Sequence, residues 1–444
     1  MKNRFTRRSF LAKSALASVA FHVLPKGRSW AQSPNNKLNI GCIGTAGRAA
    51  GDIEGVKGEN IVALCDVDAL ALAKKGEQFP AARRYADFRR MLEQKDIDAV
   101  VCGTPDHTHA VCCVAAMRSG RHVYCEKPLT RTVSEARIVA DTARKTKRVT
   151  QMGNQIHSHP GNNYRRVVEL IQTKAIGEVN EVHVWAGAIY GDKQVMDNPP
   201  PPPPHLDFDL WLGPVEYMSY RPEYVPFHWR HFWHFGGGTL ADFWCHYSDL
   251  AHWSLNLRYP LTVEAESPGK PDPELVPVKL IVRYTYPERK DASPLLSGPA
   301  LKLTWYQGGQ KPAELNQFVT PDVAAKWNSG VLFIGSKGAL LADYTRRLLL
   351  PEKDFAGFTP PPKFVPDAQG GNWHHEQWIQ AIKAGGRAEC DFDYAGPLTE
   401  AGLLGNVAYR AGKKLDWDAK NLKARGCPEA DQFIQHKYRE GWKI

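Results

Sequence analysis

Continuous apolar runs alternate with amphipathic stretches in the first third of the chain, from residue 37 to residue 150. The apolar runs have the length and composition of buried strands: KLNIGCIG, NIVALCDVD, DAVVCGTP and HVYCEKP. Stretches with helical spacing follow them, at residues 45–57, 69–79, 109–120 and 134–147. Strands that are apolar on both faces and alternate with helices predict a parallel sheet covered on both sides.

The pattern changes after residue 150. Apolar and polar residues now alternate, in residues 178–187, 262–267, 278–286 and 300–307. Such alternation is typical of an antiparallel sheet with one packed face. Helical spacing recurs at residues 164–174, 238–255, 374–385 and 395–412. With 444 residues, the chain is long enough for two or more domains.

A glycine turn, Gly44–Ala49, links the first strand to the first helix. Such a turn points backbone N–H groups at a phosphate. Asp66 ends the second strand, where a carboxylate can bind the ribose hydroxyls of adenosine. It would repel a 2′-phosphate and favours NAD over NADP. Arg48 weakens this preference slightly, because its side chain could face such a phosphate. Ala46 replaces the glycine that lets backbone approach a pyrophosphate, so a nucleotide-free domain of this shape is the alternative.

The segment Cys125–Pro128 places a lysine at the carboxyl end of a predicted parallel strand, which is the edge where ligands bind. Pro128 favours an extended backbone at Lys127. Desolvation or a neighbouring positive charge can lower the pKa of such a lysine and make it an acid or base. The alternative is an ordinary surface lysine.

A second candidate segment, Gly236–His246, is a glycine loop that leads into a helix. Asp242 and His246 are four residues apart and share one helix face. A carboxylate beside an imidazole can fix its tautomer and stabilise its protonated form. A structural hydrogen bond or a metal site is the alternative.

These motifs, in this order, resemble the glucose–fructose oxidoreductase / inositol dehydrogenase / rhizopine catabolism (Gfo/Idh/MocA) family. They are IGCIGTAGRA, VALCDVD, GTPDHTHA, CEKPLT and GGGTLADFWCH, with later matches at residues 335–340 and 374–385. The resemblance implies an α/β fold. Its N-terminal Rossmann NAD(P)-binding domain would span residues 37–155. A C-terminal α+β domain with a large, open, mostly antiparallel sheet would bind substrate and form dimers or tetramers, over residues 156–444.

The resemblance also implies roles for individual residues. His246 would take a hydroxyl proton while hydride leaves the same carbon for the nicotinamide, Asp242 would tune His246, and Lys127 would polarise the oxygen. The implied substrates are sugars, cyclitols or related polyols. The residues expected around the cofactor are Gly44, Thr45, Ala46, Gly47, Arg48, Asp66, Thr104, Pro105, His107, Glu126, Lys127 and Asn154.

The N-terminus has the pattern of a twin-arginine export signal. Arg7 and Arg8 precede an apolar run at residues 10–24, which is too short and too polar to span a bilayer stably. Small residues suggest cleavage after Ala31. We therefore expect a signal peptide over residues 1–33, export in folded form by the twin-arginine machinery, a periplasmic location and no stable membrane insertion. A disordered basic terminus is the alternative.

Charge and cysteine content argue against two further classes of protein, nucleic-acid binders and proteins built on a disulfide framework. Seven of the 57 basic residues, and none of the 47 acidic ones, lie in residues 1–32, so the remainder has only a small positive excess. A nucleic-acid binder would keep a basic patch in its folded part. The nine cysteines include no CxxC pair and lie mostly in apolar runs, which predicts buried thiols without a disulfide framework.

An unbroken proline run occupies residues 199–204. It predicts a stiff surface segment at a cleft rim or subunit contact, or a ligand for a proline-binding partner.

Four functions remain open. The first is net oxidation or reduction of a sugar hydroxyl. The second is an NAD-dependent glycosidase or lyase that oxidises a sugar transiently, cleaves it and returns the hydride. Export favours it, because little free nicotinamide exists outside the cytoplasm and a tightly bound cofactor must be regenerated in place. The third is a metal hydrolase using His228, His231 and His234, or the cluster of His107 and His109, although we expect no metal. The fourth is a non-catalytic sugar-binding protein.

Overall fold

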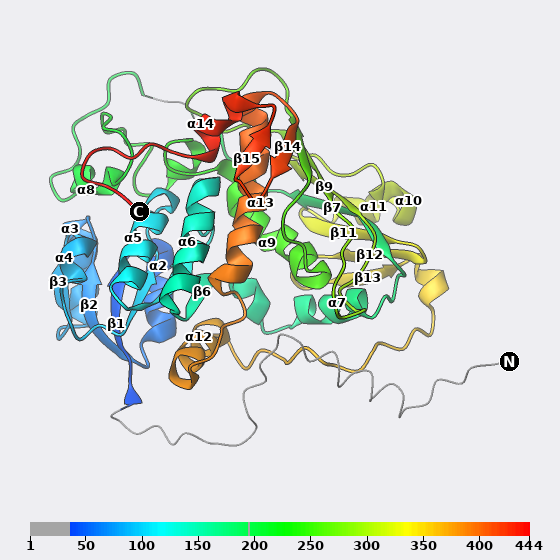
Figure 1. Ribbon diagram of the computed structural model, residues 1–444, viewed down its shortest axis with the longest axis horizontal. Coiled ribbons are helices and arrows are strands. Elements are labelled where there is room, and N and C mark those ends of the chain that lie inside the picture. The colour runs from blue at the N-terminus through cyan, green and yellow to red at the C-terminus, as the bar shows by residue number, and fades with distance from the viewer. Residues whose placement is uncertain (1–35, 194–195) are drawn as a thin grey trace.

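The computed structural model describes residues 36–193 and 196–444. The predicted export signal therefore lies outside the described residues. The first unit is a six-stranded, parallel sheet with strand order β3-β2-β1-β4-β5-β6 (Figure 1). Its strands are β1 (Asn39–Ile43), β2 (Asn60–Cys65), β3 (Arg83–Tyr85), β4 (Ala99–Cys102), β5 (His122–Glu126) and β6 (Thr150–Gly153).

Helices cover both faces of this sheet because its central strands are apolar on both sides. Every residue of β4 is buried, and so is every residue of β1 except Asn39. The helices that connect the strands are α2 (Gly47–Val56), α3 (Ala69–Gln78), α4 (Phe88–Met91), α5 (Asp106–Arg118) and α6 (Val133–Thr146). Asp68 caps α3, and Thr132 and Glu135 form a capping box at the start of α6.

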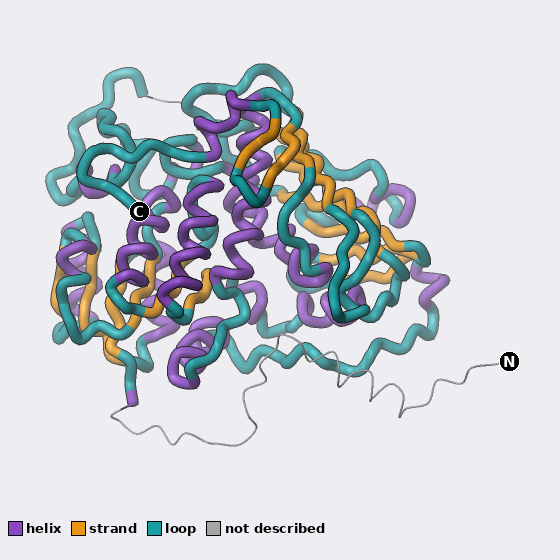
Figure 2. Tube along the Cα trace, viewed as in Figure 1, coloured by secondary structure: helices purple, strands orange, loops and turns teal. Residues whose placement is uncertain are grey.

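The second unit is built on a nine-stranded sheet with order β13-β12-β11-β7-β10-β9-β8-β14-β15. The β7–β10 pair is parallel, and the other pairs among the described residues are antiparallel. Figure 2 shows this larger sheet beside the parallel one. The strands are β7 (Val179–Ala186), β8 (Thr262–Glu266), β9 (Leu280–Tyr286), β10 (Leu301–Gln307), β11 (Gly330–Gly335), β12 (Gly338–Ala342), β13 (Arg347–Leu350), β14 (Leu415–Asp418) and β15 (Lys423–Arg425).

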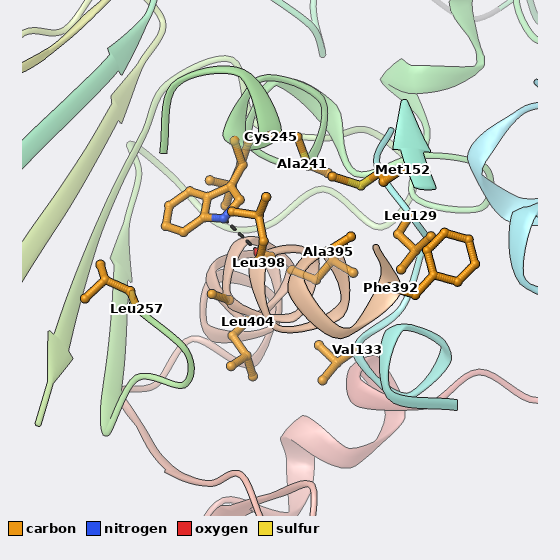
Figure 3. Close-up of a cluster of buried hydrophobic side chains, with 14 of the residues drawn as sticks. Leu129, Val133, Met152, Ala241, Cys245, Leu257, Phe392, Ala395, Leu398 and Leu404 are labelled. Atoms are coloured by element: carbon orange, nitrogen blue, oxygen red, sulfur yellow. Dashed lines mark hydrogen bonds between the residues drawn. The ribbon is translucent and has the colours of Figure 1, made fainter. Parts of the chain in front are cut away.

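Two long helices join the units. α9 (Gly238–Leu255) packs beside β7, and α13 (Phe392–Ala411) lies between α9 and α6. Figure 3 shows Ala395 and Leu398 of α13 among side chains of α9 and α6, and the Trp244 indole N–H donates to the carbonyl of Leu398 (2.8 Å). The remaining helices are η2 (Gln155–Ser158), α7 (Asn163–Gln172), α8 (Phe208–Leu212), η3 (His228–His231), α10 (Leu315–Phe318), α11 (Pro321–Ala325), η4 (Glu352–Phe355), α12 (Trp373–Ala384), η5 (Pro428–Ala430) and α14 (Asp431–Ile434).

The predicted fold class is confirmed: a Rossmann unit precedes a unit with a mostly antiparallel sheet. The division at residue 155 stays a prediction. The last long helices nevertheless return to the first unit, since α12 contacts α2 and α13 contacts α6. The nine cysteines are all free and buried, as expected. Among the described helices, none is long and apolar enough to cross a membrane.

Candidate active site

The glycine turn leaves the first N–H groups of α2 without a side-chain cap. Ala46 is the N-cap residue, and no side chain accepts a hydrogen bond there. Gly44 and Gly47 have positive φ values, 89° and 55°. A Cβ on Gly47 would meet no atom within 4 Å, so the space beside the turn is open. The uncapped N–H groups and this open space form a site that a phosphate group can enter.

Asp66 holds the turn from the end of the next strand. Its Oδ2 accepts hydrogen bonds from the backbone N–H and the hydroxyl of Thr45 (both 2.8 Å), and its Oδ1 accepts from the N–H of Asp68 (3.0 Å). Burial raises the pKa of Asp66. The segment after the proline run lies next to this carboxylate, because Leu206 pairs with Asp68 in an isolated β-bridge. The proline run therefore leads to the rim of the predicted adenosine site.

Arg48 points toward a pair of buried acids. Its guanidinium contacts Asp52 (2.9 Å) and Glu126 (3.2 Å). Gln155 also donates to Glu126 (2.6 Å). Burial, together with the charge of Asp52, raises the pKa of Glu126 to about 7, and burial raises that of Asp52 to about 6. Arg48 is thus engaged by two carboxylates.

Lys127 and Asp242 meet across the junction of the two units. Lys127 follows β5, and its Nζ forms a buried ion pair with Asp242 on the second turn of α9. Tyr190 donates its hydroxyl to the other oxygen of Asp242 (2.9 Å), and Arg230 Nε lies 3.2 Å from Oδ1. Burial by itself would raise the pKa of Asp242, but the charges of Lys127 and Arg230 hold it below its usual range.

His246 lies one turn further along α9. Its Nδ1 is buried and has no hydrogen-bond partner among the described residues. Burial and the charge of Lys127 lower its pKa to about 3, against the opposing charge of Asp242. The imidazole is therefore neutral at pH 7. Asp242 acts on it through charge, since both carboxylate oxygens are bonded to other groups.

Several other buried polar atoms near this junction also lack partners. They include both side-chain polar atoms of Asn154, Nδ1 of His107 and Oδ1 of Asp106. Natural proteins rarely leave buried polar atoms unpaired, so a concentration of them marks a place where a ligand completes the hydrogen bonds. Two of these residues, Asn154 and His107, are among those predicted around the cofactor.

The other predicted cofactor residues lie close by. The hydroxyl of Thr104 accepts from Thr108 (2.7 Å), and Pro105 is the N-cap residue of α5. His107 is fully buried, and its Nε2 contacts the carbonyl of Trp211 (2.8 Å). The structure thus brings the strand-end residues of β4, β5 and β6 to one edge of the sheet. Their assignment to the cofactor stays a prediction.

Sequence reasoning missed Tyr190 and Arg230. Both lie outside regular helices and strands with detectable periodicity: Tyr190 follows β7, and Arg230 is in the short η3. The aromatic-rich segment HWRHFWH is the available signal, but it was considered only as a possible source of metal ligands, an alternative to the expectation of no metal. Arg230 stacks on Trp229 (4.0 Å), which places its guanidinium beside Asp242.

The histidines of that segment are not among the groups of three side chains placed to hold a metal ion in the described part of the chain. Among the described residues, two groups have the geometry to hold a metal ion, namely Cys102 with His109 and Cys125, and Glu181 with His183 and Glu314. In the first group, both ring nitrogens of His109 contact backbone carbonyls, at 2.9 Å and 2.7 Å. Both nitrogens of that imidazole are thus already engaged with backbone carbonyl groups.

Family comparisons agree with this architecture. Residues 38–154 match the GFO_IDH_MocA model, described as an oxidoreductase family with an NAD-binding Rossmann fold. Residues 173–299 match the C-terminal α/β domain of the same oxidoreductase family. Together the two matches cover more than half of the chain.

Among curated proteins, a glycosyl hydrolase family 109 protein of Solibacter usitatus is 31% identical over 209 residues, which cover 42% of this chain and 46% of that protein. Inositol 2-dehydrogenase of Salmonella typhimurium is 31% identical over 187 residues, covering 41% and 52%. These alignments span about half the length of each relative.

Solved structures share the fold over most of this chain. Aldose-aldose oxidoreductase from Caulobacter crescentus, complexed with glycerol, has a TM-score of 0.58 at 19% identity and covers 86% of this chain and 100% of its own. The WlbA dehydrogenase from Bordetella pertussis, in complex with NADH and UDP-GlcNAcA, has a TM-score of 0.58 at 16% identity, covering 86% and 99%.

Proposed function

This chain belongs to the Gfo/Idh/MocA oxidoreductase family, and we propose that it is an NAD-dependent oxidoreductase acting on a hydroxyl group of a sugar, cyclitol or related polyol. The observation that carries the proposal is the site around α9. A neutral imidazole with an unpartnered Nδ1, His246, lies beside the buried ion pair of Lys127 and Asp242. Such a site can accept a proton and stabilise a developing alkoxide.

The described residues fit a dinucleotide. Gly47 leaves open space, the start of α2 is uncapped, and Asn154 and His107 keep unpartnered buried atoms. We propose NAD rather than NADP, because Asp66 would repel a 2′-phosphate and Arg48 is held by Asp52 and Glu126. Bound NAD would supply a hydride acceptor.

The protein residues would handle the proton and position the substrate. His246 takes the hydroxyl proton, because its neutral ring is free to accept one. Lys127 donates to the same oxygen and stabilises its negative charge. Asp242 fixes the Lys127 ammonium group and stabilises the imidazolium of His246 by charge. The hydroxyl of Tyr190 holds Asp242 from the other side.

Cofactor content and substrate range test this proposal. The nucleotide released from denatured protein is identified by absorbance and mass, and NADH formation is then followed at 340 nm with a panel of polyols and sugars. We expect bound or bindable NAD, and an at least 100-fold loss of kcat in His246→Gln with NAD binding retained. NAD binding absent from the folded wild-type protein would refute the proposal.

A second candidate is an NAD-dependent glycosidase or lyase that oxidises its sugar transiently. The similarity to glycosyl hydrolase family 109 proteins favours it. The same His246 and Lys127 would serve both reactions. Release of the aglycone from aryl glycosides without added NAD would select this function, whereas net NADH accumulation would select the dehydrogenase.

We further propose that the protein is exported by the twin-arginine pathway to the periplasm, and that it forms a dimer or tetramer. The first proposal rests on Arg7 and Arg8 before the apolar run of residues 10–24. Cell fractionation of the wild type and of the Arg7→Lys, Arg8→Lys double variant tests it, since the variant should remain in the cytoplasm. Light scattering of the purified chain measures the oligomeric state.

A further inference from the structure

A small cavity lies where four parts of the chain meet, apart from the predicted catalytic residues. It is lined by the start of α6, the loop before α9, the second half of α13 and the C-terminal tail, by which we mean residues 431–444. Its volume is about 50 Å³. A cavity of that size holds a few water molecules or one small polyatomic ion, and it is too small for a sugar or a dinucleotide.

Two arginines reach this cavity from different elements. Nε and Nη2 of Arg131 are buried and have no hydrogen-bond partner, and its Nη1 makes only a 3.4 Å contact with the carbonyl of Trp233. Arg410 of α13 lies over the rings of Phe433 (4.2 Å) and Trp233 (4.9 Å). Among the described residues, neither guanidinium forms a salt bridge. Both positive charges are thus partly buried without a directly paired carboxylate, and burial lowers the pKa of Arg131 although the charge of Glu135 opposes that effect.

A histidine adds a third unsatisfied group. Nε2 of His436, in the C-terminal tail, is buried and unpartnered, and the residue lines the same cavity. No acid is among the lining residues described. Glu135 is the closest in sequence to Arg131, but its carboxylate accepts from the N–H of Thr132 (2.9 Å) and the hydroxyl of Tyr438 (2.5 Å).

Burying cations without an anion is costly, so this arrangement calls for a missing counter-ion. We propose that the cavity binds a small oxyanion between Arg131, Arg410 and His436. Guanidinium groups present N–H donors in a fork that fits the oxygens of phosphate, sulfate or a carboxylate. Burial and the charge of Arg131 lower the pKa of Arg410 to about 10, and a bound anion would relieve that repulsion.

The anion would bind residues of both units at once and so stabilise their contact. Arg131 belongs to the Rossmann unit, Arg410 to α13 and His436 to the C-terminal tail. Gly237, the N-cap residue of α9, also lines the cavity, and Asn406 donates to its carbonyl (2.8 Å). Occupancy should therefore fix the tail and the entry to the helix that carries Asp242. This role does not depend on the proposed reaction.

Anion-dependent stability tests the proposal on the full chain. Protein in a phosphate-free and sulfate-free buffer is titrated with sodium phosphate, sodium sulfate, sodium acetate or sodium chloride at matched ionic strength. We expect phosphate or sulfate to raise Tm in a saturable way by about 3 °C, because a ligand that binds the folded state stabilises it. Calorimetry gives the affinity, and the rate of tail proteolysis should fall with the same midpoint. Saturation with acetate as well would identify carboxylates as a second source of the ligand.

Variants assign the effect to this cavity. Arg410→Met keeps the apolar stem over Trp233 and Phe433 but removes the charge, and we expect at least a tenfold loss of phosphate affinity. His436→Gln changes a residue outside any helix and tests the site if Arg410→Met fails to fold. Arg90→Met is the control, since Arg90 is 73% exposed and pairs with Glu93. A response equal in chloride, or unchanged in Arg410→Met and His436→Gln, would overturn the proposal.

Discussion

Gly103 shows how closely the Rossmann sheet holds the turn that would bind the dinucleotide. It follows β4 directly, and a Cβ at this position would lie 2.6 Å from Cβ of Ala49 and 2.8 Å from its Cα. Carbon atoms in contact are normally about 3.5–4.0 Å apart, so a Gly103→Ala change must push the start of α2 away by about 1 Å. Backbone cannot yield as a flexible side chain does. Overpacking of this kind costs about 1–3 kcal/mol.

The displacement falls on the N-terminal turn of α2, whose free N–H groups face the predicted pyrophosphate site. We therefore expect Gly103→Ala to lower the free energy of unfolding by about 2 kcal/mol and to weaken NAD binding at least tenfold. Urea unfolding followed by tryptophan fluorescence measures the first effect. Calorimetric titration of the folded variant with NAD measures the second.

Gly51 on the same helix provides a matched control. It is exposed, has no positive φ, and a Cβ there would come no closer than 3.7 Å to Arg48. Gly51→Ala should raise the free energy of unfolding by about 0.5–1 kcal/mol through helix propensity, with NAD binding unchanged. If Gly103→Ala binds NAD like the wild type at unchanged stability, the close packing of α2 on β4 does not control the site.

Three further predictions concern the active site and the core. Asp242→Asn leaves Lys127 and Arg230 buried without their shared anion, so the free energy of unfolding should fall by about 3 kcal/mol and turnover should drop; urea unfolding that matches the wild type would contradict this. Glu126→Gln removes a carboxyl whose pKa is raised in the folded state. The wild type is destabilised as pH rises from about 4.5 to about 7, so the variant should gain about 3 kcal/mol relative to it between pH 4.5 and pH 8; equal pH dependence in thermal unfolding would count against it. Leu398→Ala opens a cavity beneath α9 and should cost about 3 kcal/mol, with unfolding curves as the check.

Local sequence patterns predicted many of the helices and strands of the fold. The helix expected at residues 238–255 is α9 (Gly238–Leu255), and the four apolar runs of the first third contain β1, β2, β4 and β5 of the six-stranded parallel sheet. The sequence did not predict the short strands β3, β6, β14 and β15, nor the consecutive strands β11, β12 and β13. β12 is buried along four of its five residues, so its sequence lacks the alternation that marks a strand with one exposed face.

Part of the candidate site could also be predicted from the sequence. Helical spacing placed Asp242 and His246 on one face, and the strand end placed Lys127 at the ligand edge. The spacing of residues along the chain could not predict which side chain each of these groups would bond to. Asp242 was expected to tune His246, and the structure shows that its two oxygens are bonded to Lys127 and Tyr190, so that it acts on the imidazole through charge.

The sequence by itself determined the long helices, the strands with a clear apolar pattern, and which chemistry lies at strand ends and helix faces, because these depend on local periodicity and short spacing. Only the tertiary structure decided which distant groups meet. Tyr190 and Arg230 reach Asp242 from irregular segments, and Arg131 and Arg410 face one cavity although 279 positions separate them. Such contacts depend on how the two units and their long helices pack, and no local pattern records that packing.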